Sequence, residues 1–499
     1  MTDSLKKRYA IKLLANVVTG LINALLIAVV PKALGPMHYG YFTYLQQFFS
    51  QIVAFLDAGT SIGFFTKLSA DNNRKELLKF YLFFSLLLLL FLFILIYFCE
   101  YLGLLNYVFS GVPGRYIYVG LWFGYLTWFT QVYIKISDAY ALTVSVELIK
   151  IAHKILMLGA LLYIVNYLSF DLSVYFYFHL LSLASFVVLL SFLFLDRGIF
   201  RYSILSMKFS IRTLMSEFYK FCSPLFIFNC IAVGVGLFDI WLLQKISGSI
   251  EMGFYGLAFS IAAMCFLFTS AMTPVITREF SKSYQEKEFS EMKRLFNRYV
   301  PMLYAIATYF SVFIAFQADN LLSIFTDERF EGAYLALVII AYYPLHQTYG
   351  QINAALFFAT EDTRKYRNIG LVTTVIGLIF SYIFIYTLKW GAEGLAWKMV
   401  VAQIIGVNIQ LFFNAKKLDI IYFKFLYHQF YTIIFFCVVA FVANLLVGAY
   451  TAADIQFFIT GAVYSCLALL GVFMFPPIFG VSREELTRFF RNVELRIKN

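Results

Sequence analysis

Long uninterrupted apolar runs are the feature that most constrains this chain. The stretch FYLFFSLLLLLFLFILIYF covers residues 80–98 without a charged side chain, and similar runs recur to the end of the sequence. A helix of about 20 apolar residues spans a bilayer and satisfies its own backbone hydrogen bonds. A membrane β-barrel would alternate polar and apolar residues over segments of about 10 residues, and these runs do not alternate. The sequence therefore predicts an all-α polytopic membrane protein.

The charge content supports this class of protein. Only 13% of the residues are charged, whereas soluble domains carry about 25%. The net charge of +11 comes from basic residues spread through short connections, so it does not indicate a nucleic-acid partner. The sequence has no phosphate-binding loop and no cysteine or histidine spacing typical of a metal site. We therefore expect no catalytic residues, no metal ligands and no enzymatic activity.

Glycine, proline and charge clusters divide the chain into about 14 predicted membrane spans. They cover residues 9–30, 41–65, 77–99, 115–137, 142–165, 172–195, 217–244, 254–278, 299–318, 332–359, 367–388, 393–414, 425–447 and 456–478. Counting along these spans, 33 of the 39 lysines and arginines fall on the side that holds the N-terminus. Because cytoplasmic connections carry the excess of basic residues, both termini are predicted to be cytoplasmic.

The two halves of the chain carry a similar pattern. Asn16 precedes Tyr41 in YGYFTYLQQF by 25 residues, and Asn229 precedes Tyr255 in MGFYGLAFSI by 26 residues. Two parallel repeats of six spans are a common transporter plan, with the substrate site at the repeat interface. We expect a six-helix lobe at 1–195, a basic cytoplasmic linker at 196–216, a second six-helix lobe at 217–415, and two further transmembrane helices with a cytoplasmic tail at 416–499.

Three stretches carry a resemblance to a known family. VVPKALGPMHYGYF and the following FLDAGTSIGFF resemble the opening of polysaccharide transporters of the MATE/MOP superfamily, and FYGLAFSIAAM resembles the matching point of the second lobe. Relatives of the O-antigen (Wzx-type) flippase kind translocate oligosaccharides linked to undecaprenyl diphosphate. The resemblance implies a bacterial cytoplasmic (inner) membrane location. Implied partners are that lipid-linked oligosaccharide, membrane lipids, a polysaccharide polymerase and a chain-length regulator.

A diphosphate inside such a protein requires cations. We predict that Lys12, Lys67 and Arg278 form a cluster near the cytoplasm that receives the diphosphate. Alternatives remain for each residue. Lys12 would instead extend its side chain to the membrane surface, and Lys67 and Arg278 would only anchor helix ends.

Polar residues at helical spacing predict the lining of a central cavity that accepts the sugar. They lie on the first, second, seventh, eighth and tenth predicted spans. The predicted lining residues are Asn16, Thr19, Asn23, Gln47, Gln51, Asn229, Thr273, Tyr342, His346, Tyr349 and Asn353. The alternative is helix–helix packing, in which small polar side chains hydrogen-bond between helices.

Two acidic residues, Asp57 and Asp239, lie well inside predicted spans. Acids within the membrane often mark ion pathways, so both are candidates for binding a coupling H⁺ or Na⁺. The alternative is a structural pairing with a nearby lysine. No cofactor is expected apart from such an ion.

Three functions fit these patterns to different degrees. The first is a flippase that moves a lipid-linked oligosaccharide from the cytoplasmic to the periplasmic leaflet by alternating access. The second is a MATE-like, cation-coupled exporter of small amphipathic molecules on the same fold. A membrane-embedded polysaccharide polymerase fits less well, because the predicted outer connections are too short for the large periplasmic loop that such proteins usually keep.

Overall fold

A computed structural model describes residues 5–71, 73–200, 210–266, 273–448 and 452–480. In this part every regular element is a helix, which confirms the all-α prediction. The chain separates into two compact units, unit 1 at 1–256 and unit 2 at 257–499. This division falls inside a long helix rather than at the basic segment 196–216, and the predicted domain boundaries stay a prediction.

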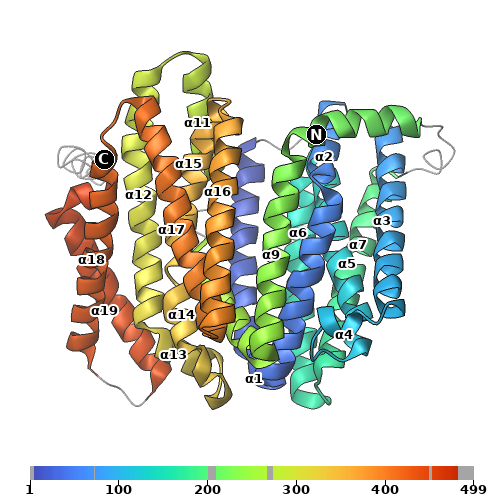
Figure 1. Cartoon of the computed structure of the whole chain (residues 1–499), viewed down its shortest axis with the longest axis horizontal. Helices are drawn as coiled ribbons and strands as arrows, with labels where there is room; N and C mark the ends of the chain where they lie inside the picture. Colours follow the sequence, from blue (N-terminus) through green and yellow to red (C-terminus); the bar gives the residue numbers. More distant parts are fainter. Residues whose placement is uncertain (1–4, 72, 201–209, 267–272, 449–451, 481–499) are drawn as a thin grey trace, which may run out of the picture. The chain divides into compact units, whose positions relative to one another are not determined.

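Unit 1 is built from helices that are coloured blue to green in Figure 1. They are α1 (Leu5–Asp57), α2 (Thr60–Ala70), α3 (Lys75–Tyr101), α4 (Leu105–Val108), α5 (Gly114–Ala139), α6 (Thr143–Tyr167), α7 (Leu172–Asp196) and α9 (Ile211–Ala262), whose last turns enter unit 2. Aromatic and aliphatic side chains of α2, α3, α5, α6, α7 and α9 form its core, in which Phe64 stacks on Tyr81 with ring centroids 4.3 Å apart.

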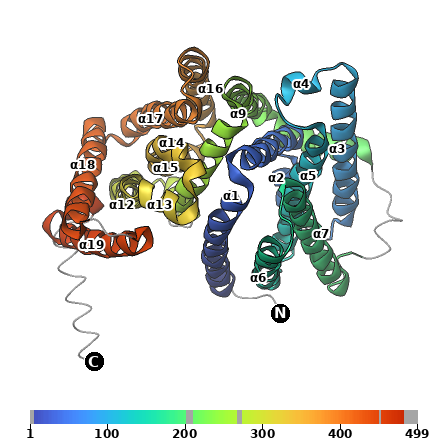
Figure 2. The ribbon, with the colours of Figure 1, turned by 90° about the horizontal axis from the view of Figure 1, so that it is seen from below.

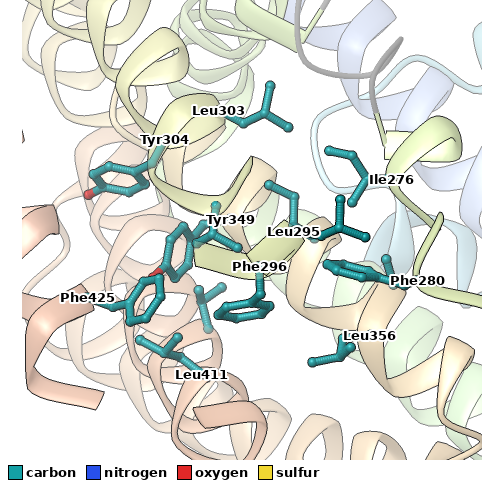
Figure 3. Packing of buried hydrophobic residues seen from close by; sticks show 14 of the residues in the cluster. Ile276, Phe280, Leu295, Phe296, Leu303, Tyr304, Tyr349, Leu356, Leu411 and Phe425 are labelled. Carbon is teal, nitrogen blue, oxygen red and sulfur yellow. The ribbon is translucent and has the colours of Figure 1, made fainter. Parts of the chain in front are cut away.

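Unit 2 continues with shorter helices and several breaks. Its elements are η1 (Ala263–Cys265), α11 (Thr273–Gln285), α12 (Phe289–Phe316), α13 (Ala318–Phe325), η2 (Glu328–Ala333), α14 (Tyr334–Ile340), α15 (Tyr343–Ala359), α16 (Thr363–Ser381), the π-helical η3 (Tyr382–Thr387), α17 (Gly391–Leu418), α18 (Tyr422–Val447), α19 (Ala453–Met474) and η4 (Pro476–Phe479). Side chains of α11, α12, α15, α17 and α18 form one core, in which Phe296 and Tyr349 lie (Figure 3). The two C-terminal helices pack beside α12 through a second core containing Ala440, Ala443 and Tyr464 (Figure 2).

The predicted spans agree well with these helices. Each of the 14 predicted ranges overlaps between one and three consecutive helical elements of the described residues. In the described residues, 10 helices are long and apolar enough to cross a membrane. The helices α1 and α9 are longer than one span because each joins two predicted spans.

Glycine kinks make these joins. In α1 the kink lies at Gly35, with φ 74° and ψ 167°, and in α9 it lies at Gly248, with φ 83° and ψ −178°. Glycine adopts such positive φ angles without a steric penalty. The predicted break at residues 31–42 is therefore a single-residue kink, with helix on both sides. The kinks also correct the repeat alignment, because Gly35 matches Gly248 and Gly40 matches Gly253, whereas the sequence comparison had matched Tyr41 with Tyr255.

Candidate functional site

The most polar buried arrangement in unit 1 surrounds Asp57, at the end of α1. Ala58 and Gly59 follow it with φ angles of 46° and 83°, so the helix stops and α2 starts in a new direction. The carboxylate of Asp57 accepts hydrogen bonds from the Ser61 nitrogen (3.0 Å), the Ser61 hydroxyl (2.7 Å) and the Thr60 hydroxyl (2.9 Å). Asp57 thus satisfies otherwise unpaired groups at the start of α2.

Two helices further along the chain complete this Asp57 network. The Tyr81 hydroxyl on α3 donates to the same carboxylate at 3.0 Å, and the Lys135 ammonium on α5 donates to the Ser61 hydroxyl at 2.6 Å. The carboxylate therefore has a positive charge one hydroxyl group away, and the side chain of Asp57 is buried. Asp57 is linked to Lys135 through the Ser61 hydroxyl, and its role in binding a coupling ion stays a prediction.

Sequence reasoning missed both Tyr81 and Lys135. Neither residue is among the site residues that the sequence predicts. A signal existed, because Lys135 lies inside an otherwise apolar predicted span, YVGLWFGYLTWFTQVYIKI. The sequence gives no comparable signal for Tyr81, since tyrosine is frequent along the whole chain.

The predicted cationic cluster is only partly described. The side chain of Lys12 lies outside the described residues. Lys67 forms an ion pair with Glu217 of α9 at 3.1 Å, and Arg74 contacts the same carboxylate at 3.3 Å. Arg278, on α11 of unit 2, is exposed. The positive charge of Lys67 is thus compensated by Glu217, and the role of the cluster in binding a diphosphate stays a prediction.

The predicted lining residues of unit 1 differ in exposure. Asn16 and Asn23 are exposed, and the amide oxygen of Asn23 accepts a hydrogen bond of 3.4 Å from Lys154 on α6. Thr19 is half-buried, and so are Gln47 and Gln51, both on the part of α1 that follows the kink. The side chain of Asn229 lies outside the described residues.

The predicted lining residues of unit 2 lie deeper. His346, Tyr349 and Asn353 on α15 are buried, and Tyr349 belongs to the hydrophobic core (Figure 3). Asn414 on α17 donates to the Asn353 side-chain oxygen at 2.9 Å and to the Asn353 main-chain oxygen at 3.1 Å. The polar stripe of α15 therefore makes helix–helix contacts in this structure, and its cavity-lining role stays a prediction.

The remaining candidates are accounted for as follows. Tyr342 is half-buried, with its hydroxyl 3.9 Å from the sulfur of Cys437. Thr273, at the start of α11, donates to Gln351 at 3.4 Å. Asp239 is buried on α9. Within the described residues, no three His, Cys, Asp or Glu side chains gather closely enough to hold a metal ion.

An apolar groove runs between α17 and α18. Its volume is about 420 Å³, and its walls are Ile404, Ile405, Asn408, Ile409, Phe412, Tyr422 and Leu426. Asn408 supplies the amide in this lining. Such a wall suits a hydrocarbon chain and offers nothing to bind a charge.

Comparisons with known proteins show which fold this chain shares. Residues 224–383 match the family model MatE. The lipid II flippase MurJ, in an inward closed conformation, aligns with a TM-score of 0.69 at 16% identity and covers 92% of this chain and 98% of its own. An inward-facing multidrug resistance MATE family transporter of the MOP superfamily aligns with a TM-score of 0.59 at 15% identity, covering 84% of this chain and 96% of its own.

An outward-facing transporter of the same description aligns with a TM-score of 0.54 at 15% identity and covers 83% of this chain and 96% of its own. A search of curated proteins finds no match. The chain thus has the fold of MATE/MOP superfamily transporters, and its structural neighbours include both a lipid flippase and drug exporters.

Proposed function

We propose that this protein is a flippase of the bacterial cytoplasmic membrane that translocates an oligosaccharide linked to undecaprenyl diphosphate, by alternating access. The extent of the structural matches carries the proposal. The lipid flippase covers 92% of this chain, whereas the two exporters cover 84% and 83%. The flippase alignment thus extends over more of the present chain, which contains the two helices α18 and α19 after the second set of six spans.

The chemistry of the described residues supports a substrate with three different parts. A polyprenyl chain matches the apolar groove between α17 and α18. A diphosphate requires cations, for which Lys12, Lys67 and Arg278 are the proposed ligands. Sugar hydroxyls require amides and hydroxyls, which Gln47 and Gln51 of α1 and Tyr342, directly before α15, would offer.

A coupling ion remains part of the proposal, with Asp57 and Asp239 as its positions. At Asp57, an H⁺ or Na⁺ would have to compete with the donors of Ser61, Thr60 and Tyr81 and with the charge of Lys135. Asp239 is the other candidate position, and its side chain is also buried. Replacing Asp239 by asparagine would abolish any dependence of transport on the ion gradient, whereas the same change of a structural acid would lower the amount of folded protein.

Complementation tests the substrate. Strains that lack their own flippase and make different O-antigen repeat units would express this protein, and surface polysaccharide would be measured. We expect restoration in at least one strain. Arg278→Ala should lower the restored amount at least about tenfold, and Lys282→Ala, one turn away on α11 and also exposed, should not. If the two changes lower the restored polysaccharide equally, Arg278 is not part of the binding site.

The second candidate is a cation-coupled exporter of small amphipathic molecules. The MatE match over residues 224–383 favours it specifically. An efflux assay with cationic dyes distinguishes the two functions. Dye efflux together with no restored polysaccharide in any strain would replace the flippase proposal by the exporter.

A further inference from the structure

A carboxylate of α9 contacts the basic residues at the junction of α2 and α3. Glu217 accepts hydrogen bonds from the Lys67 ammonium at 3.1 Å and from the two terminal nitrogens of the Arg74 guanidinium at 3.3 and 3.4 Å. Lys67 lies in the last turn of α2, and Arg74 directly precedes α3. Glu217 thus receives three cationic N–H donors from residues that are 143 and 150 positions away in the sequence.

Arg74 and Glu217 are each held in place by a further contact. The Nε of Arg74 donates to Glu76, in the first turn of α3, at 2.9 Å, which leaves both terminal guanidinium nitrogens for Glu217. Phe218, next to Glu217 on α9, is buried and stacks on Phe80 of α3 with ring centroids 5.4 Å apart. The cations are therefore positioned by α2 and α3, whereas the carboxylate comes from a different helix.

The contacts of Glu217 are those that a phosphate group would make. A guanidinium binds a carboxylate and a phosphate in the same bidentate way, and an ammonium adds a point charge to either. The side chains of Lys67, Arg74 and Glu217 are 22%, 29% and 31% exposed, so a ligand from the aqueous side can reach the donors. Ion pairs at this exposure are weak, and a stronger anion can replace the carboxylate.

We infer that Glu217 competes with the substrate for Lys67 and Arg74: its carboxylate occupies these cations while no substrate is bound, and the diphosphate of the lipid-linked oligosaccharide displaces it. The inference rests on the proposed function and adds Arg74 to the residues that contact the diphosphate. It also makes Glu217 a specificity-determining residue. A phospholipid headgroup with a single negative charge gains no more from the two cations than Glu217 already does, whereas a diphosphate carries more charge.

Titration of the full-length protein with inorganic pyrophosphate in detergent micelles tests the competition. We expect Glu217→Gln to bind pyrophosphate at least about tenfold more tightly than the parent, because the cations lose their counter-charge. The matched control is Glu291→Gln on α12, which removes the same charge from an ion pair with Arg294 at nearly equal exposure, 32%. The control should leave the affinity unchanged. Equal affinities of Glu217→Gln and the parent, or an equal gain in the control, would overturn the inference.

Two further variants keep the test decisive if Glu217→Gln does not fold. Glu217→Asp retains the charge but is one methylene shorter, so its contacts should be weaker and pyrophosphate affinity should rise about threefold. Adding Lys67→Ala to either variant should remove the gain. The inference is wrong if Glu217→Asp binds pyrophosphate no better than the parent, or if the gain survives Lys67→Ala.

Nanodiscs distinguish the diphosphate from lipid headgroups. Compared with phosphatidylcholine, phosphatidylglycerol should weaken pyrophosphate binding by Glu217→Gln at least about threefold and should leave the parent unaffected. If phosphatidylglycerol weakens binding by both proteins equally, Glu217 does not select the diphosphate and the inference fails. If the competition is observed but no flippase-deficient strain regains surface polysaccharide, the flippase proposal fails and the diphosphate site stands.

Discussion

The Asp57 network of unit 1 and the Asn353–Asn414 contact of unit 2 are both buried, and they differ in charge. In unit 1 the carboxylate of Asp57 lies at a helix break and accepts from Ser61, Thr60 and Tyr81, with the ammonium of Lys135 beside it. In unit 2 the amides of Asn353 and Asn414 join two uninterrupted helices. A carboxylate needs several donors and a counter-charge to be tolerated away from water, whereas an amide needs only another amide.

This difference explains where each network occurs. A helix break leaves backbone nitrogens without partners, and Asp57 uses the Ser61 nitrogen as one of its donors. Inside the continuous helices α15 and α17 the backbone nitrogens are already paired, and the side-chain contact between Asn353 and Asn414 is neutral. We therefore expect the charged network to be the more sensitive of the two to substitution.

The largest effect is expected for Asp57→Asn. The substitution leaves Lys135 without a counter-charge and turns an amide NH₂ toward groups that are themselves donors. We expect the free energy of unfolding to fall by about 3 kcal/mol, because several donors around a buried carboxylate lose their charged acceptor. Denaturant-induced unfolding in detergent micelles, followed by helical circular dichroism, measures it.

The matched control is Asp171→Asn. Asp171 caps α7 at an exposed site, where it accepts from the Val174 nitrogen at 2.8 Å. Asparagine caps a helix as well as aspartate does, so the change should stay below about 0.5 kcal/mol. A similar loss in both variants would show that the charge of Asp57 has no structural role.

A smaller effect is expected in the neutral network of unit 2. Asn414→Ala removes both hydrogen bonds to Asn353 and should cost about 2 kcal/mol, because a buried acceptor loses its donor. Asn353→Ala should cost a similar amount. The double variant should lose less stability than the sum of the two single losses, since the shared hydrogen bond is lost only once. Strict additivity would mean that the two amides are not energetically coupled.

The smallest effect concerns an ion pair outside the spans. Lys417 donates to Asp362 at 2.5 Å, and this hydrogen bond holds the pKa of the Asp362 carboxyl below its usual value. A depressed carboxyl pKa stabilises the folded state above the unfolded-state pKa, and this contribution is lost as the pH falls through the folded-state pKa. Lys417→Ala should therefore cost up to about 1 kcal/mol at pH 7.

The pH dependence is the sharper part of that prediction. At about pH 3, where much of the carboxyl is protonated in the unfolded chain, the difference between Lys417→Ala and the parent should shrink. The control is Lys282→Ala, which removes an exposed lysine 4.0 Å from Glu286. If the difference for Lys417→Ala is as large at pH 3 as at pH 7, the ion pair with Asp362 does not contribute to stability.

The helical part of the fold was accessible from sequence, because span length and the distribution of basic residues follow from the bilayer alone. The partners of the polar residues were not accessible. Lys135 meets Ser61 across 74 positions of sequence, and Asn414 meets Asn353 across 61. Periodicity shows which face of a helix a residue occupies but not which helix lies opposite. For this reason the stripe on α15 was correctly recognised as polar, yet its burial in the core of unit 2 was not foreseen.

The stretch PKALGPMHYGYF illustrates the same limit. The sequence by itself determined that the chain must bend there, because Pro31, Gly35 and Pro36 interrupt an apolar run and only glycine accepts the required φ angle without strain. Only the tertiary structure decided that Gly40 matters as much as the bend. Gly40 packs against the carbonyl of Ser249 on α9, and no local pattern records how closely two distant backbones approach each other.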